Sequence, residues 1–228
     1  MQKMIIVLSL FICSHVHAQE YRKDTRDPKQ KEDPYNSYQA DLVSKTDLLK
    51  ALELAGVQVF KFPLAPFAKE YRLSVRIDEY VGGKKASSRD LYGMGKNTYT
   101  HFEDTGLIHP RPVLFKDFID QLTLFSKNGN DSSVIVTLVT YAGSDGIRLQ
   151  KKQTRKLQFY NWRRYSKTDW VLDQDIPLLV WASSWYDPKN NVERFCGAVD
   201  LSRDDQETKT LLNASPHYYV ISYRVSEK

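Results

Sequence analysis

One stretch of this sequence combines side chains that could bind a polyanion. Residues 148–167 contain no Asp or Glu and carry four aromatic residues beside eight basic ones, Arg148, Lys151, Lys152, Arg155, Lys156, Arg163, Arg164 and Lys167. Cations attract an anionic polymer, and aromatic planes stack on bases or sugar rings. We therefore predict a ligand-binding surface made of Arg155, Trp162, Arg163, Arg164, Tyr165 and Lys167.

The alternative for the same stretch is a solvated sheet face. On this interpretation Leu157, Phe159 and Asn161 point inward, while the intervening Lys156, Gln158 and Tyr160 point outward. The charge would then only aid solubility.

Motifs for catalysis or cofactor binding are not found in the sequence. Lys96 lies in a Gly-containing stretch, but Asn97 follows it where a phosphate loop has Ser or Thr. No two histidines have the spacing of a zinc site, and no Gly-x-Ser-x-Gly elbow marks a serine nucleophile. The sequence therefore predicts no enzyme activity, no metal and no cofactor.

A hydrolase acting on envelope glycan or peptidoglycan is an alternative, because such an enzyme needs only two carboxylates across a cleft. The candidates are Asp78, Glu79, Glu103, Asp173, Asp175 and Asp187. Which of them meet in space cannot be inferred from spacing among 28 acidic residues.

The N-terminus has the pattern of a signal peptide, predicted over residues 1–18. Lys3 supplies a positive charge, residues 4–13 are an apolar run, and Val16-His17-Ala18 fits a peptidase site before Gln19. The apolar run rises only about 15 Å as a helix, too short to span a bilayer. Ile12 precedes Cys13 where a lipoprotein has a small residue. We expect an exported protein, periplasmic or on the cell surface or secreted, with no transmembrane segment after cleavage.

Cleavage would leave a mature chain with one cysteine, Cys196, and therefore no internal disulfide. Only Lys3 is lost from the 33 basic and 28 acidic residues, so the mature net charge is +4. Cys196 lies in an apolar stretch and is expected to be a buried small side chain. The alternative is a nucleophile paired with His217.

The rest of the chain is predicted to be a flexible polar arm over residues 19–40 and one β-rich domain over residues 41–228. A short amphipathic helix is expected near residues 45–55, with Ser44 or Thr46 as its cap and Gly56 at its end. Its leucine stripe, Leu48, Leu49 and Leu52, is expected to pack on a sheet.

After Gly56 the apolar residues alternate with period two, which is typical of half-buried strands. Turn signals separate the strands at 82–83, 128–129, 143–146 and 187–190. Residues 113–125 fit either a helix or a strand, with strand expected from about Phe118. About nine strands joined by hairpins, without intervening helices, predict an antiparallel β-sandwich.

Several features of the sequence resemble those of known groups of proteins. The signal ending Val-His-Ala, the charged arm, the short helix and LSVRIDEYVGGKK at residues 73–85 resemble small exported proteins of unknown function from Gram-negative gut bacteria. Residues 118–124 (FIDQLTL) are similar to the closing strand of jelly-roll carbohydrate-binding modules. The resemblance implies a β-sandwich architecture and carries over no catalytic residue.

These patterns predict an exported, non-catalytic binding or interaction domain. Its expected partner is an anionic glycan, another polyanion or another envelope protein, because export makes intracellular nucleic acid an unsuitable target. The alternatives are the hydrolase above and a structural subunit that assembles by edge-strand pairing.

Overall fold

The computed structural model describes residues 44–92, 95–103, 113–195, 200–203 and 205–227. Contacts divide the chain into two compact units, Met1–Ala51 and Leu52–Lys228. The predicted signal peptide and polar arm, together with His109 and Cys196, lie outside the described residues.

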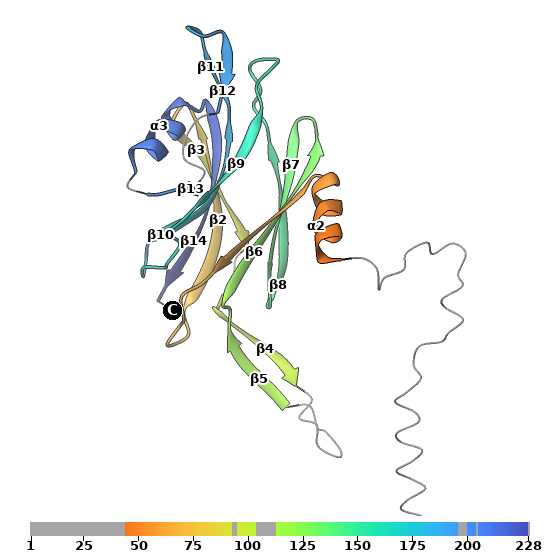
Figure 1. Ribbon diagram of the computed structural model, residues 1–228. Coiled ribbons are helices and arrows are strands. Elements are labelled where there is room, and N and C mark those ends of the chain that lie inside the picture. The colour runs from red at the N-terminus through yellow and green to blue at the C-terminus, as the bar shows by residue number, and fades with distance from the viewer. Residues whose placement is uncertain (1–43, 93–94, 104–112, 196–199, 204, 228) are drawn as a thin grey trace, which may run out of the picture. The chain divides into compact units, whose positions relative to one another are not determined.

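The described residues form two helices and fourteen strands (Figure 1). The helices are α2 (Lys45–Leu54) and α3 (Gln206–Ala214). The strands are β1 (Val57–Pro63), β2 (Arg72–Val81), β3 (Lys84–Tyr92), β4 (Thr98–Glu103), β5 (Val113–Phe118), β6 (Gln121–Asn130), β7 (Ser133–Thr140), β8 (Gly143–Gln150), β9 (Tyr160–Tyr165), β10 (Asp175–Ser183), β11 (Trp185–Asp187), β12 (Val192–Arg194), β13 (Asp200–Leu201) and β14 (His217–Ser226).

The predicted antiparallel β-sandwich is confirmed. One sheet has the order β1-β6-β7-β8 and the other has the order β13-β9-β10-β14-β2-β3, and the two face one another across the main core. All pairings in these sheets are antiparallel except β13 with β9. The hairpins β4–β5 and β11–β12 are separate two-stranded sheets.

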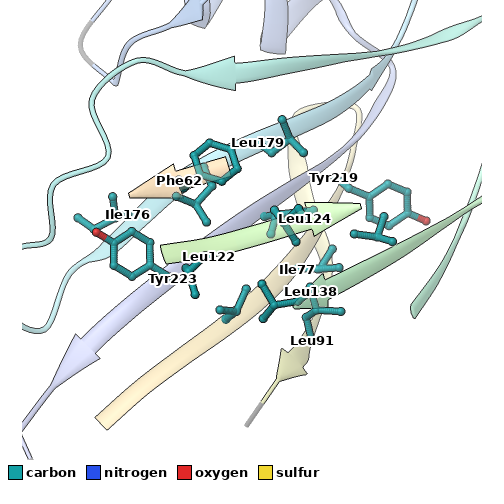
Figure 2. Close-up of a cluster of buried hydrophobic side chains, with 14 of the residues drawn as sticks. Phe62, Ile77, Leu91, Leu122, Leu124, Leu138, Ile176, Leu179, Tyr219 and Tyr223 are labelled. Atoms are coloured by element: carbon teal, nitrogen blue, oxygen red, sulfur yellow. The ribbon is translucent and has the colours of Figure 1, made fainter. Parts of the chain in front are cut away.

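Alternating side chains fill the space between the sheets. Leu122, Leu124 and Leu138 of the smaller sheet meet Ile77, Tyr223 and Leu179 of the larger one, as Figure 2 shows. The larger sheet is buried on its other face as well. There Tyr165, Val180, Ala182, Leu201 and Tyr218 form a second cluster with Leu211 of α3. Strands β10 and β14 are therefore apolar on both faces, as central strands must be.

The turn predictions are right in part. Gly82 and Gly83 have φ of 55° and 75° and join β2 to β3 as predicted. The other two glycine signals are displaced, because β6 continues through a bulge at Gly129 to Asn130 and β8 already begins at Gly143. The uncertain segment 113–125 contains two strands, β5 and β6, separated by Ile119 and Asp120.

The structure differs from the predictions for both helices. The Ser44 cap of α2 is confirmed, because Ser44 Oγ accepts from the Asp47 amide at 3.1 Å and Asp47 Oδ2 accepts from the Ser44 amide at 3.0 Å. Burial of its leucine stripe was wrongly expected: Leu48 and Leu49 are 55% and 63% exposed. The cap stabilises this helix locally without buried leucines. Helix α3 was not predicted, although Asp205 caps it by accepting from the Thr208 amide.

Candidate functional site

The predicted basic segment, residues 148–167, does not form one surface. It begins in β8, passes through an irregular loop at residues 151–159 and ends just after β9. The expected alternation before β9 is wrong, because Leu157 is 74% and Phe159 44% exposed while Gln158 is buried. The cause is that these residues are not a strand: Gln158 Oε1 accepts from the Thr154 amide and folds the loop on itself.

The two aromatic residues predicted to bind ligand lie in the protein core. The Trp162 ring packs between Phe60 and Trp181, with ring centres 5.7 Å and 5.8 Å away. Tyr165 points to the opposite face of the sheet and belongs to the second apolar cluster. Both rings therefore contact protein in this conformation, and they do not share a face.

Three of the four predicted basic ligands have protein partners. Arg155 forms a bidentate pair with Glu193, with Nε–Oε1 at 2.7 Å and Nη2–Oε2 at 3.4 Å. Arg163 lies over the Phe195 ring at 4.6 Å, and burial lowers the pKa of its guanidinium. Arg164 approaches Asp200 at 3.8 Å, and Lys167 is exposed. The six predicted residues are thus distributed over both faces of β9 and its flanks.

A polar network that the spacing did not indicate lies at one end of the main core. Glu79 of β2 and His217 of β14 are both buried, and His217 Nε2 is 3.1 Å from Glu79 Oε1. The other ring nitrogen, Nδ1, is 2.6 Å from the hydroxyl of Tyr160 at the start of β9. Lys152 from the irregular loop reaches Glu79 Oε1 at 2.6 Å. Four separate parts of the chain therefore meet in one network.

The hydrogen bonds assign the protons in this network. The amide of Lys152 donates to the Tyr160 oxygen at 2.8 Å, so the Tyr160 hydroxyl is free to donate to His217 Nδ1. His217 then carries its proton on Nε2 and donates it to Glu79 Oε1. Ser87 Oγ donates to the other carboxylate oxygen at 2.8 Å. The imidazole is neutral and the carboxylate is ionised in this arrangement.

The surroundings support that assignment. Burial acts to raise the pKa of Glu79, but hydrogen bonds from Lys152, Ser87 and His217 outweigh it and hold the pKa at about 2. Burial lowers the pKa of His217, against the opposing effect of Glu79. Burial also raises the pKa of Tyr160 to about 12. Because each carboxylate oxygen already has donors within the protein, the network is suited to holding the loop at residues 151–159 on the sheet.

Three of the other acids nominated for hydrolysis, Asp78, Asp175 and Asp187, form ion pairs. Asp78 pairs with Lys85 at 2.7 Å and Asp187 with Arg194 at 2.7 Å. Asp175 lies between Arg76 and Arg224 at 3.5 Å and 3.8 Å. Within the described part of the chain, no group of three or more His, Cys, Asp or Glu could hold a metal ion.

The outer face of the smaller sheet differs in composition from the rest of the surface. The outward positions of the strand register include 14 residues: Val57, Val59, Lys61 and Pro63 of β1, Gln121, Thr123, Phe125 and Lys127 of β6, Ile135, Thr137 and Val139 of β7, and Ser144, Gly146 and Arg148 of β8. None of the 14 is acidic. We call this surface the basic face.

The centre of the basic face is apolar, and three exposed cations surround it. Val59, Phe125 and Ile135 are half-buried and belong to neither apolar cluster. Gly146 completes the row of Val59, Phe125 and Thr137 without a side chain, which leaves that end of the row open. Lys61, Lys127 and Arg148 are exposed, and among the described residues none of them forms an ion pair.

Comparison with known families identifies the chain. The family model described as a domain of unknown function, DUF5041, matches residues 29–227. This chain belongs to the DUF5041 family. The match spans the whole sandwich of this DUF5041 protein, and its description names no activity. No curated protein and no solved structure matches the chain. No helix in the described ranges has the length and apolar character needed to cross a membrane.

Proposed function

We propose that this DUF5041 protein is an exported, non-catalytic binding domain that binds an anionic glycan through the basic face. The observation that supports the proposal most directly is the set of three exposed cations, Lys61, Lys127 and Arg148, around an apolar centre without a carboxylate. Cations attract the acidic groups of such a polymer, and the apolar centre contacts the C–H faces of its sugar rings.

The position of these cations favours a ligand over a purely solubilising role. Surface charges that serve solubility are usually mixed in sign. On the basic face all charges have one sign. They flank half-buried apolar side chains that water contacts when no ligand is bound. Arg148 also has a defined orientation, because its Nη1 donates to Ser133 Oγ at 3.2 Å. A binding surface needs both the uniform sign and the fixed orientation.

The test is retention on immobilised heparin as a function of salt. Each cation that contacts a ligand anion releases a counterion, so Lys61→Gln, Lys127→Gln and Arg148→Gln together should reduce the slope of log K against log salt by about 2 to 3. The matched control replaces Lys84, Lys189 and Lys209 by Gln, three exposed lysines on other elements with the same total charge.

The two triple variants separate site binding from net charge. Loss of slope in the first variant alone supports the basic face, whereas equal losses in both would leave only non-specific attraction and refute the proposal. Urea unfolding of both variants should match the parent within about 1 kcal/mol, because exposed charges contribute little to stability.

A further inference from the structure

Four aromatic rings form a continuous strip at the end of the smaller sheet where β7 turns into β8. Tyr141, Tyr99, His101 and Phe115 follow one another with ring centres 5.1, 5.5 and 6.0 Å apart and planes within 29° of parallel. We call this array the aromatic strip. Its two end rings are accessible, since Tyr141 is 64% and Phe115 38% exposed.

The strip is assembled from two hairpins. Tyr99 and His101 are two apart on β4 and share a face of the β4–β5 hairpin, and Phe115 is the cross-strand partner of His101. Tyr141 lies in the turn between β7 and β8. Stacking of Tyr141 on Tyr99 therefore connects the β4–β5 hairpin to the smaller sheet of the sandwich.

Strand β7 connects the aromatic strip to the basic face. Val139 is an outward residue of the basic face, and Tyr141 follows it by two positions. Lys127 and Arg148 lie toward the opposite end of the strands, because the register pairs them with Ile135. A ligand that contacts Lys127 and Arg148 as well as the aromatic strip must extend along the length of β7.

Core packing does not account for the end rings. One face of each is stacked on its neighbour in the strip, while 38% to 64% of each side chain remains in contact with water. Exposed aromatic faces in an ordered row are a stacking surface for flat rings of a ligand.

We propose that the aromatic strip and the basic face form one extended site for a chain of acidic sugar rings. The anionic groups bind at Lys127 and Arg148, and sugar rings further along the chain stack on Tyr141 and Phe115. This inference rests on the proposed function and specifies its ligand as a polymer several residues long. A short acidic oligosaccharide bound at Lys127 and Arg148 does not reach these rings.

The test uses heparin-derived oligosaccharides of defined length, a tetrasaccharide and a dodecasaccharide, with affinity measured by calorimetry. The dodecasaccharide should bind the unmodified protein at least about tenfold more tightly, since one stacked ring is worth roughly that factor or more. Tyr141→Ala together with Phe115→Ala should remove this gain and leave tetrasaccharide affinity unchanged. Lys127→Gln with Arg148→Gln should weaken both ligands.

Two controls keep the outcomes separable. Tyr186→Ala removes another exposed aromatic side chain, 41% exposed on β11, and should change neither affinity. Tyr141→Phe keeps the ring and should retain the length gain. If neither oligosaccharide binds the unmodified protein, the proposed function fails. If both bind with no length gain, or the gain survives in the double aromatic variant, only the inference is overturned. The inference is also overturned if the unmodified protein self-associates in sedimentation and the Tyr141→Ala, Phe115→Ala variant does not. The aromatic strip would then bind a second copy of the chain.

Discussion

Replacing Glu79 by Gln tests the proton assignment in the buried network. The pKa of Glu79 falls from an ordinary 4.5 to about 2 on folding. A difference of about 2.5, at roughly 1.4 kcal/mol per unit of pKa, gives the ionised carboxylate about 3 kcal/mol of pH-dependent stability. Gln has nearly the same shape, so the substitution removes the charge without leaving a cavity.

The sign of the pH dependence follows from the direction of the change. A lowered folded pKa contributes stability that is complete above the unfolded value of 4.5 and is lost as the pH falls toward 2. About 2 kcal/mol of the total should therefore disappear between pH 7 and pH 3. The lowered pKa of His217 acts in the same direction but begins earlier, below about pH 6.5, where the unfolded imidazole takes up a proton.

The assay is urea unfolding of the parent and Glu79→Gln at pH 7, 5 and 3. The variant should lose about 2 kcal/mol less than the parent between pH 5 and pH 3, and should begin from a lower stability at pH 7. Glu53→Gln, at an exposed position, is the matched control and should behave as the parent does. Parallel pH profiles for the parent and Glu79→Gln would refute the proton assignment.

Other predictions test the core, the cap and the N-terminus. Trp162→Ala should destabilise the protein by about 3 to 5 kcal/mol in urea unfolding, because the ring is buried between two aromatics; a loss below about 1 kcal/mol would place the ring at the surface. Asp205→Ala should cost about 1 kcal/mol by removing the cap of α3, with Asp205→Asn as the conservative control. Mass spectrometry of the protein from fractionated cells should find Gln19 as the first residue, and a full-length cytoplasmic product would contradict export.

The sandwich was predictable because burial repeats along each strand. Leu73, Val75 and Ile77 alternate with polar residues, and each apolar member is buried in the main core. Hairpin signals located the turn at Gly82 and Gly83 and the turn at residues 187–190 between β11 and β12. At Gly129 and Gly143 the same residue type lies inside or at the start of a strand, so a glycine alone did not locate the turn.

The sequence contains a signal for the polar network. Glu79 continues the buried phase of Leu73, Val75 and Ile77, which places a carboxylate where an apolar residue is expected. His217 stands in the same phase as Tyr219, Ile221 and Tyr223 on β14. A charged residue in the apolar phase of a strand requires a buried partner. What the pattern does not give is the register that pairs β2 with β14, and hence which partner it is.

The basic face and the aromatic strip depend on pairing between strands distant in sequence. Lys61 and Lys127 are far apart in the chain and lie on one surface only because β1 pairs with β6 in a fixed register. A shift of that register by one residue would turn Lys61 inward and bring Phe62 out, so burial of Phe62 fixes the position of the lysine. Composition along the chain detects a basic segment, such as residues 148–167, but a binding surface is made across strands. The core residues that set the register therefore also determine which cations share a face.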